Sequence, residues 1–160
     1  MKRGQAFDTM MLVISVIVAV AILGMLLGFL GNIGGFGAKA KDVIPDLVKK
    51  IQQKGFGLEN KDSVEFNKDD RIYQQDAIGT SSVDEKNILF VCASDSICSD
   101  GTDTPLTVTD TKIVCNRKIS VTVAVCYNGN HDNLYRIVIG GSTASDSAAS
   151  KAETECGLSG

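Results

Sequence analysis

Residues 9–30 read TMMLVISVIVAVAILGMLLGFL, a run of 22 residues in which Thr9 and Ser15 are the only polar side chains. As an α-helix this run would be about 33 Å long, enough to cross the roughly 30 Å hydrocarbon core of a membrane. The apolar part of a secretory signal peptide is shorter, roughly 7–15 residues. The run therefore predicts a long helix that stays on the protein and lies in lipid or among other helices.

The residues just before this run include a glycine, a glutamine and an acid that a plain membrane anchor does not require. Lys2 and Arg3 are followed by Gly4 and Gln5, and the acid Asp8 lies at the edge of the apolar run. A simple anchor requires only basic residues and hydrophobicity. This junction resembles the amino terminus of archaeal type IV pilin-like proteins. In that family a prepilin-type peptidase removes a short basic leader that ends in Gly, and the helix remains on the mature protein.

The resemblance implies that residues 1–4 are a leader and that cleavage falls between Gly4 and Gln5. It implies a type IV pilus-like or archaellum-like filament at the cell surface, built by bundling of N-terminal helices and used for adhesion or motility. The implied partners are copies of the same chain, the membrane before assembly, the prepilin-type peptidase and the assembly machinery. The family has Glu at the fifth mature position, where this chain has Thr9, so Asp8 is either the pairing acid or a first-turn acid favoured by the helix dipole.

Glycines mark two features of the long helix. Gly24, Gly28 and Gly31 recur at the spacing i, i+4, i+7 and form a small-residue stripe that lets helices approach closely. Residues 31–37, GNIGGFG, contain four glycines, which weaken helix and predict a break there.

An amphipathic segment follows the predicted break. Residues 44, 47, 48 and 51 are apolar at the spacing of one helical face. Pro45 suits a first helical turn and Gly55 suits a carboxyl cap. In the resembling pilins such a segment packs under the head, whereas a helix lying on lipid is the alternative. We assign residues 5–54 to the helical part and residues 55–160 to a head.

Five cysteines lie in the predicted head, and none forms a C-x-x-C pair: Cys92, Cys98, Cys115, Cys126 and Cys156. Two disulfides in an oxidising extracellular compartment are the natural interpretation. The candidate pairing joins Cys92 to Cys98 and Cys115 to Cys126, with Cys156 as the candidate free thiol, but the connectivity cannot be deduced from sequence. Reduced, buried cysteines in a cytosolic head are the alternative. Lysines after the apolar run, taken alone, also favour that orientation.

The head is predicted to be rich in antiparallel β-structure, so the expected class is α+β. Residues 119–127 alternate between two faces and, with residues 134–139, predict a hairpin across the turn-forming NGNHDN. Residues 87–93 and 106–115 predict further strands. Residues 140–160 are small and polar and predict a linker or an irregular surface.

No catalytic, metal or cofactor motif is present in the sequence, and a formal net charge of −3 gives no sign of nucleic-acid binding. The only histidine, His131, lies in a polar turn, and a metal site needs several convergent ligands. Acids in residues 94–105 do not match the EF-hand spacing. We therefore expect no enzyme, but a filament subunit, a minor pilin-like binding module, or an uncut single-pass surface protein with a disulfide-bonded ectodomain.

Overall fold

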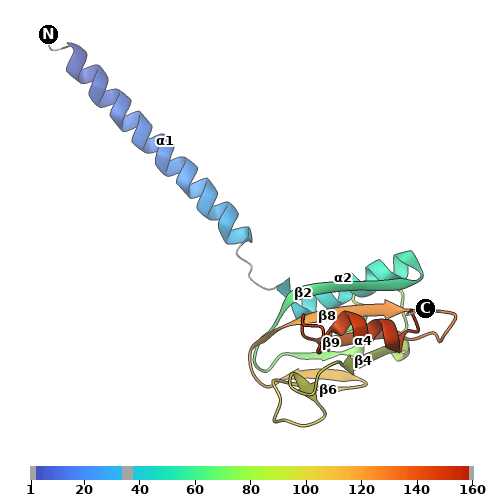
Figure 1. Cartoon of the computed structure of the whole chain (residues 1–160). Helices are drawn as coiled ribbons and strands as arrows, with labels where there is room; N and C mark the ends of the chain where they lie inside the picture. Colours follow the sequence, from blue (N-terminus) through green and yellow to red (C-terminus); the bar gives the residue numbers. More distant parts are fainter. Residues whose placement is uncertain (1–2, 34–37, 159–160) are drawn as a thin grey trace. The chain divides into compact units, whose positions relative to one another are not determined.

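The computed structural model describes residues 3–33 and 38–158, with side chains for residues 8–26 and 38–158. The chain divides into two compact units, Met1–Phe36 and Gly37–Gly160 (Figure 1). The α+β class expected from the sequence is confirmed. The helix over residues 40–54 belongs to the second unit, whereas the sequence analysis grouped it with the long apolar helix.

The first unit contains one helix, α1 (Arg3–Ile33), whose 31 residues correspond to about 46 Å of helix. Leu, Met, Ile, Val and Ala fill most of it, and no polar stripe runs along it. The predicted break is not seen in the described part, because residues 31–33 are still helical. Residues 34–37 lie outside the described residues.

The second unit is built around a five-stranded sheet. Its strand order is β1 (Ala38–Lys39), β2 (Gly57–Phe66), β8 (Ile119–Tyr127), β9 (Tyr135–Gly140) and β4 (Ile88–Cys92). β8 and β9 form the predicted antiparallel hairpin, and β2 pairs antiparallel with β8. The antiparallel, β-rich head is thus confirmed only in part, because the sheet is mixed: β1 pairs with β2 and β4 pairs with β9 in parallel. Several strands lie between β4 and β9 in the chain, which supplies the long crossover that parallel pairing needs.

A second sheet contains four short strands in the order β3 (Arg71–Tyr73), β7 (Lys112–Cys115), β6 (Leu106–Thr109) and β5 (Cys98–Ser99). β6 and β7 pair antiparallel across Asp110 and Thr111, with Thr109 opposite Lys112. The sequence predicted one strand over residues 106–115, whereas the structure has a tight hairpin. Asp favours turns because its side chain can bond nearby backbone, so two residues suffice to reverse the chain.

Helix α2 (Ala40–Lys54) confirms the predicted amphipathic segment, and its apolar face is buried in the core of the second unit. Pro45 lies inside the helix, beyond the first turn predicted for it. Gly55 forms the carboxyl cap in the left-handed conformation, with φ 73°, and its N–H donates to the Ile51 carbonyl at 2.8 Å. That conformation is easy for glycine and costly for other residues.

The tail contains a helix, α4 (Ala148–Glu155), where the sequence predicted irregular structure. Ser147 caps it, because its hydroxyl accepts a hydrogen bond from the Ser150 N–H at 3.3 Å. Ala148, Ala152 and Cys156 are fully buried on one face at the spacing i, i+4, i+8. Such small residues give a weak apolar pattern, which explains why the helix was missed. Two short helices, α3 (Gln74–Ile78) and η1 (Glu85–Asn87), lead into β4.

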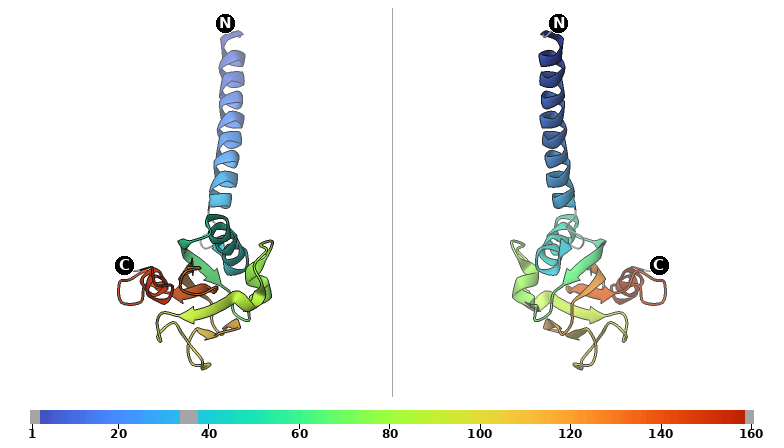
Figure 2. Two further views of the ribbon diagram at one scale, coloured as in Figure 1. Left: turned by 90° about the vertical axis from the view of Figure 1, so that its right-hand side faces the viewer. Right: turned by 90° about the vertical axis from the view of Figure 1, so that its left-hand side faces the viewer.

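Both faces of the large sheet are covered. On one face, the side chains of Val121, Val123 and Val125 pack in the main core, which also contains the apolar face of α2. On the other, Ala124 and Cys126 pack against the small residues of α4. The figures show α2 (teal) and α4 (red) on opposite sides of the strands (Figures 1 and 2). The alternation predicted for β8 is thus confirmed, with neither face left to solvent.

Candidate functional site

The first candidate site is the surface of α1. Thirteen large apolar side chains between residues 10 and 26 are exposed, from 50% at Val13 to 76% at Met25. Exposed apolar surface of this extent marks a surface made for lipid or for other protein. The small-residue position Gly24 lies within it, and a Cβ built there would meet no atom within 4 Å.

In the described part of the chain, one helix is long and apolar enough to cross a membrane, over Asp8–Leu26. A signal sequence meets the same criterion, so the helix indicates membrane insertion or a signal sequence. The Ser15 hydroxyl donates a 2.5 Å hydrogen bond to the Met11 carbonyl within the helix. This bond satisfies the serine without any outside partner, which suits an apolar environment.

The residues of the predicted cleavage junction lie at the start of α1. Gly4 and Gln5 are in its first turn, and Asp8 is an exposed residue a turn further on. Gly28 and Gly31 continue the helix, but their surroundings lie outside the described side chains. The structure therefore places all three sets of predicted residues on α1.

The disulfides confirm part of the prediction and correct the rest. Cys92 and Cys98 are bonded, with an S–S distance of 2.00 Å, as predicted. The second bond joins Cys126 to Cys156, with an S–S distance of 1.98 Å, so the predicted Cys115–Cys126 pair and the free Cys156 are both wrong. Cys115 is the free thiol of the described residues. Side-chain direction decides this outcome, because Cys126 points to the α4 face while Cys115 is part of the main core.

Burial sets the chemistry of the free thiol. Cys115 is 1% exposed, and this desolvation raises its pKa above the ordinary value because it disfavours the charged thiolate. Its Sγ donates to the Arg117 carbonyl at 3.0 Å. A buried thiol of raised pKa is inert, so Cys115 is a core residue rather than a reactive one.

A buried arginine and an amide fasten the tail to the hairpin. The Arg136 guanidinium donates to the Asp132 carboxylate through Nη1 at 3.0 Å and Nη2 at 2.6 Å. These bonds hold the pKa of Asp132 at about 2, below its usual range. Arg136 Nε lies 3.9 Å from a Glu155 carboxylate oxygen of α4. The Asn128 amide donates to the Cys156 carbonyl at 2.9 Å.

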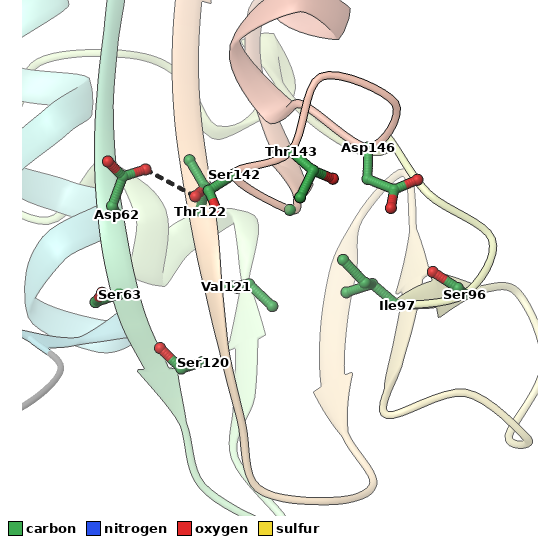
Figure 3. A pocket seen from close by; sticks show the side chains of 11 residues that line it. Asp62, Ser63, Ser96, Ile97, Ser120, Val121, Thr122, Ser142, Thr143 and Asp146 are labelled. Carbon is green, nitrogen blue, oxygen red and sulfur yellow. Dashed lines mark hydrogen bonds between the residues drawn. The ribbon is translucent and has the colours of Figure 1, made fainter.

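A polar pocket of about 370 Å³ is the second candidate site (Figure 3). It opens where β2, β8, the loop after β9 and the loop after β4 come together. Two carboxylates, six hydroxyls and two branched aliphatic side chains line it, together with Gly141: Asp62, Ser63, Ser96, Ile97, Ser120, Val121, Thr122, Ser142, Thr143 and Asp146. The sequence analysis singled out none of these residues, because no local motif joins four separate segments.

The predicted polar turn and loop show no metal-binding arrangement in the described part of the chain. The His131 side chain is 53% exposed, and its Nδ1 lies 3.2 Å from an Asp132 oxygen. Asp95 is exposed between β4 and β5, and Asp100 and Asp103 are exposed between β5 and β6. No three potential metal-ligating residues of the described part gather into a group.

Comparison of the chain with protein-family models, with curated proteins and with solved structures finds no match. The function is therefore argued from the geometry of α1 and of the head.

Proposed function

We propose that this protein is a structural subunit of an extracellular type IV pilus-like or archaellum-like filament, assembled by bundling of N-terminal helices. The apolar surface of α1 carries the proposal: thirteen large apolar side chains are exposed, while the second unit has a complete core of its own. At about 25 cal/mol per Å² of apolar surface, hiding these side chains outweighs contacts between polar heads. Lipid holds α1 before assembly and neighbouring copies of α1 hold it afterwards.

The cleavage junction and the glycine stripe support assembly through α1. Cutting between Gly4 and Gln5 would keep the whole apolar helix on the mature subunit. Gly24, Gly28 and Gly31 would let neighbouring helices approach closely. Asp8, exposed on α1, is the acid available to meet the new amine of a neighbouring subunit.

The head fits a place outside the cell. Two disulfides indicate an extracellular location, since such bonds persist in oxidising compartments. The partners in this proposal are copies of the same chain, the membrane, a prepilin-type peptidase and the assembly machinery. The role is structural, in adhesion or motility, rather than catalytic.

An uncut single-pass surface protein is the second candidate. One apolar span of 19 residues and a disulfide-bonded head are sufficient for it. It differs from the filament subunit in two measurable ways, because its amino terminus stays intact and it forms no filaments.

Processing and assembly test the proposal together. Mass spectrometry of surface material is expected to find Gln5, free or cyclised to pyroglutamate, at the amino terminus, and electron microscopy is expected to show filaments. Gly4→Leu is expected to block both, because the peptidase requires a small residue before the cut.

Gly101→Leu is the matched control, since Gly101 is exposed and a Cβ there meets only the Ser99 hydroxyl, at 3.6 Å. This variant is expected to be cut and assembled normally. Surface material that begins at Met1 or Lys2, or discrete monomers without filaments, would replace the filament proposal by the single-pass one.

A further inference from the structure

The polar pocket lies at the end of β8 that extends beyond its pairing with β9. The last pair between these strands is Thr122 with Gly140, so residues 119–121 of β8 have no partner on the β9 side. Beyond Gly140 the chain folds back on itself, and the Gly141 N–H donates to the Asp146 carbonyl at 2.7 Å. A Cβ at Gly140 would lie 2.8 Å from the Ala93 Cβ, so this close return needs glycine. The loop of residues 141–147 is thereby fixed as one wall.

The opposite wall is a β-bulge in β2. The pairing of β2 with β8 shifts between Lys61 and Val64, which places Asp62 and Ser63 opposite Thr122. Ser63 adopts a positive φ of 56°, a costly conformation for a residue other than glycine. The Thr122 hydroxyl donates to Asp62 Oδ1 at 2.8 Å, which fixes the carboxylate at the pocket (Figure 3). Bulges of this kind re-aim side chains next to binding sites.

A disulfide braces the third wall. Ser96 and Ile97 lie inside the short loop closed by Cys92 and Cys98. The Ile97 N–H donates to the Ser94 carbonyl at 3.0 Å within that loop. The pocket is therefore preformed, since each wall is held by a disulfide, a hydrogen bond or a paired strand. Its volume lies within the roughly 300–1,000 Å³ usual for small-molecule sites.

The lining defines the chemistry of a ligand. Figure 3 shows Asp62 and Asp146 at opposite sides of the opening, with Val121 and Ile97 between them. The Asp146 carboxylate accepts no hydrogen bond from the described part of the chain, so it is free to accept from a ligand. No Lys, Arg or His lines the pocket in the described part, which disfavours an anionic ligand.

We propose that this pocket binds a neutral sugar unit. Carboxylates accept hydrogen bonds from sugar hydroxyls, and Ser and Thr hydroxyls can both donate and accept. Val121 and Ile97 offer apolar surface to the C–H face of a sugar ring. Charged sugars such as uronates are rejected, because their carboxylate would meet Asp62 and Asp146 without a compensating cation. The site belongs to the head alone and does not depend on filament assembly.

NMR titration of the full chain tests this proposal. The protein is solubilised in a phosphocholine detergent, because detergents with sugar headgroups would compete. The probes are free glucose, galactose, mannose, N-acetylglucosamine and glucuronate, each added in EDTA. At least one neutral sugar is expected to give saturable millimolar binding, with amide shifts at Asp62, Thr122 and residues 141–146. Glucuronate is expected to give none.

Two variants and a control locate the binding. Asp62→Asn and Asp146→Asn are each expected to weaken the sugar at least tenfold while the remaining amide spectrum stays unchanged. Asp103→Asn, at an exposed residue that does not line the pocket, is expected to bind as the parent does.

Three outcomes would overturn the proposal. The first is that no neutral sugar gives a saturable shift, and the second is that Asp103→Asn weakens sugar binding as much as Asp62→Asn and Asp146→Asn do. The third is that CaCl₂ alone, in an EDTA-free sample, produces the same shifts, which would make the pocket a cation site. None of these outcomes bears on whether α1 assembles, so failure here leaves the filament proposal standing.

Discussion

At the scale of single residues, the pair of Asp132 and Arg136 joins the hairpin turn to β9, and Arg136 also lies 3.9 Å from Glu155 of α4. Asp132 keeps its charge because Arg136 holds its pKa at about 2. A carboxyl whose pKa is lowered on folding contributes stability that is present above its unfolded pKa of about 4. That contribution is lost as the pH falls through the folded pKa.

Acid unfolding measures this pair directly. For a fragment of residues 38–160, the free energy of unfolding in urea is expected to fall by about 2 kcal/mol or less between pH 4 and pH 2 through Asp132. Asp132→Asn is expected to flatten this part of the pH profile and to lower stability at pH 7, since Arg136 stays buried without its partner.

Asp100→Asn serves as the control, because Asp100 is exposed on a loop and makes no ion pair within the described residues. It should leave the pH profile as it is in the parent fragment. A profile for Asp132→Asn that is equally steep between pH 4 and pH 2 would show that the pair contributes no pH-dependent stability.

At the scale of elements, α4 depends on one covalent bond more than on its apolar surface. Only small side chains face the sheet, so the burial of apolar area is modest. The bond between Cys126 and Cys156 spans a sequence separation of 30, against 6 for the bond between Cys92 and Cys98. Loop-closure entropy therefore predicts about 3–4 kcal/mol of stabilisation from the longer bridge and about 2 kcal/mol from the shorter one.

Removing each bridge separates the two effects. The double variant Cys126→Ala with Cys156→Ala is expected to lose the larger amount and to lose hydrogen-exchange protection across α4 (Ala148–Glu155). The double variant Cys92→Ala with Cys98→Ala is the matched control, with loss confined to residues 93–99. Equal protection of α4 in both would mean that packing alone holds the tail.

Elements with a strong apolar period were predictable, and elements held by distant contacts were not. The helix α1, the buried face of α2 and the hairpin of β8 and β9 each carry their signal in adjacent residues. α4 has only alanine at the spacing of its buried face, although Ser147 as a cap was a usable sign. The parallel pairing of β4 with β9 depends on the order of the strands in the folded sheet, and the partner of Cys126 depends on the face to which its side chain points. The pocket was out of reach because its walls come from four segments.

At the scale of the whole molecule, the chain combines a helix that cannot remain exposed to water with a unit that has its own core. The main core of the second unit draws on α2 and on both sheets, and its members lie within residues 40–139. A fragment of residues 38–160 is therefore expected to be a soluble, folded monomer. Light scattering and slow hydrogen exchange in β8 and β9 would check this.

The full chain without detergent is the comparison sample, and it is expected to assemble or precipitate. If the fragment instead aggregates or exchanges its β8 and β9 amides quickly, α1 contributes to folding of the head. The second unit would then be compact in the structure but unable to fold without α1.

The position of Cys156 near the end of the sequence bears on the order in which the two disulfides of the head form. A ribosome produces the cysteines in sequence, so Cys156 is the last of the five to reach an oxidising compartment. Cys126 cannot form its native disulfide before Cys156 arrives. Until then Cys115, only eleven positions away in the sequence, is a competing partner for Cys126. In the folded head Cys115 is buried in the main core, away from the α4 face where Cys126 lies, so folding of that core would remove this competitor. The bridge that fastens α4 is then expected to be the later of the two disulfides to form, once residues 148–156 have been exported.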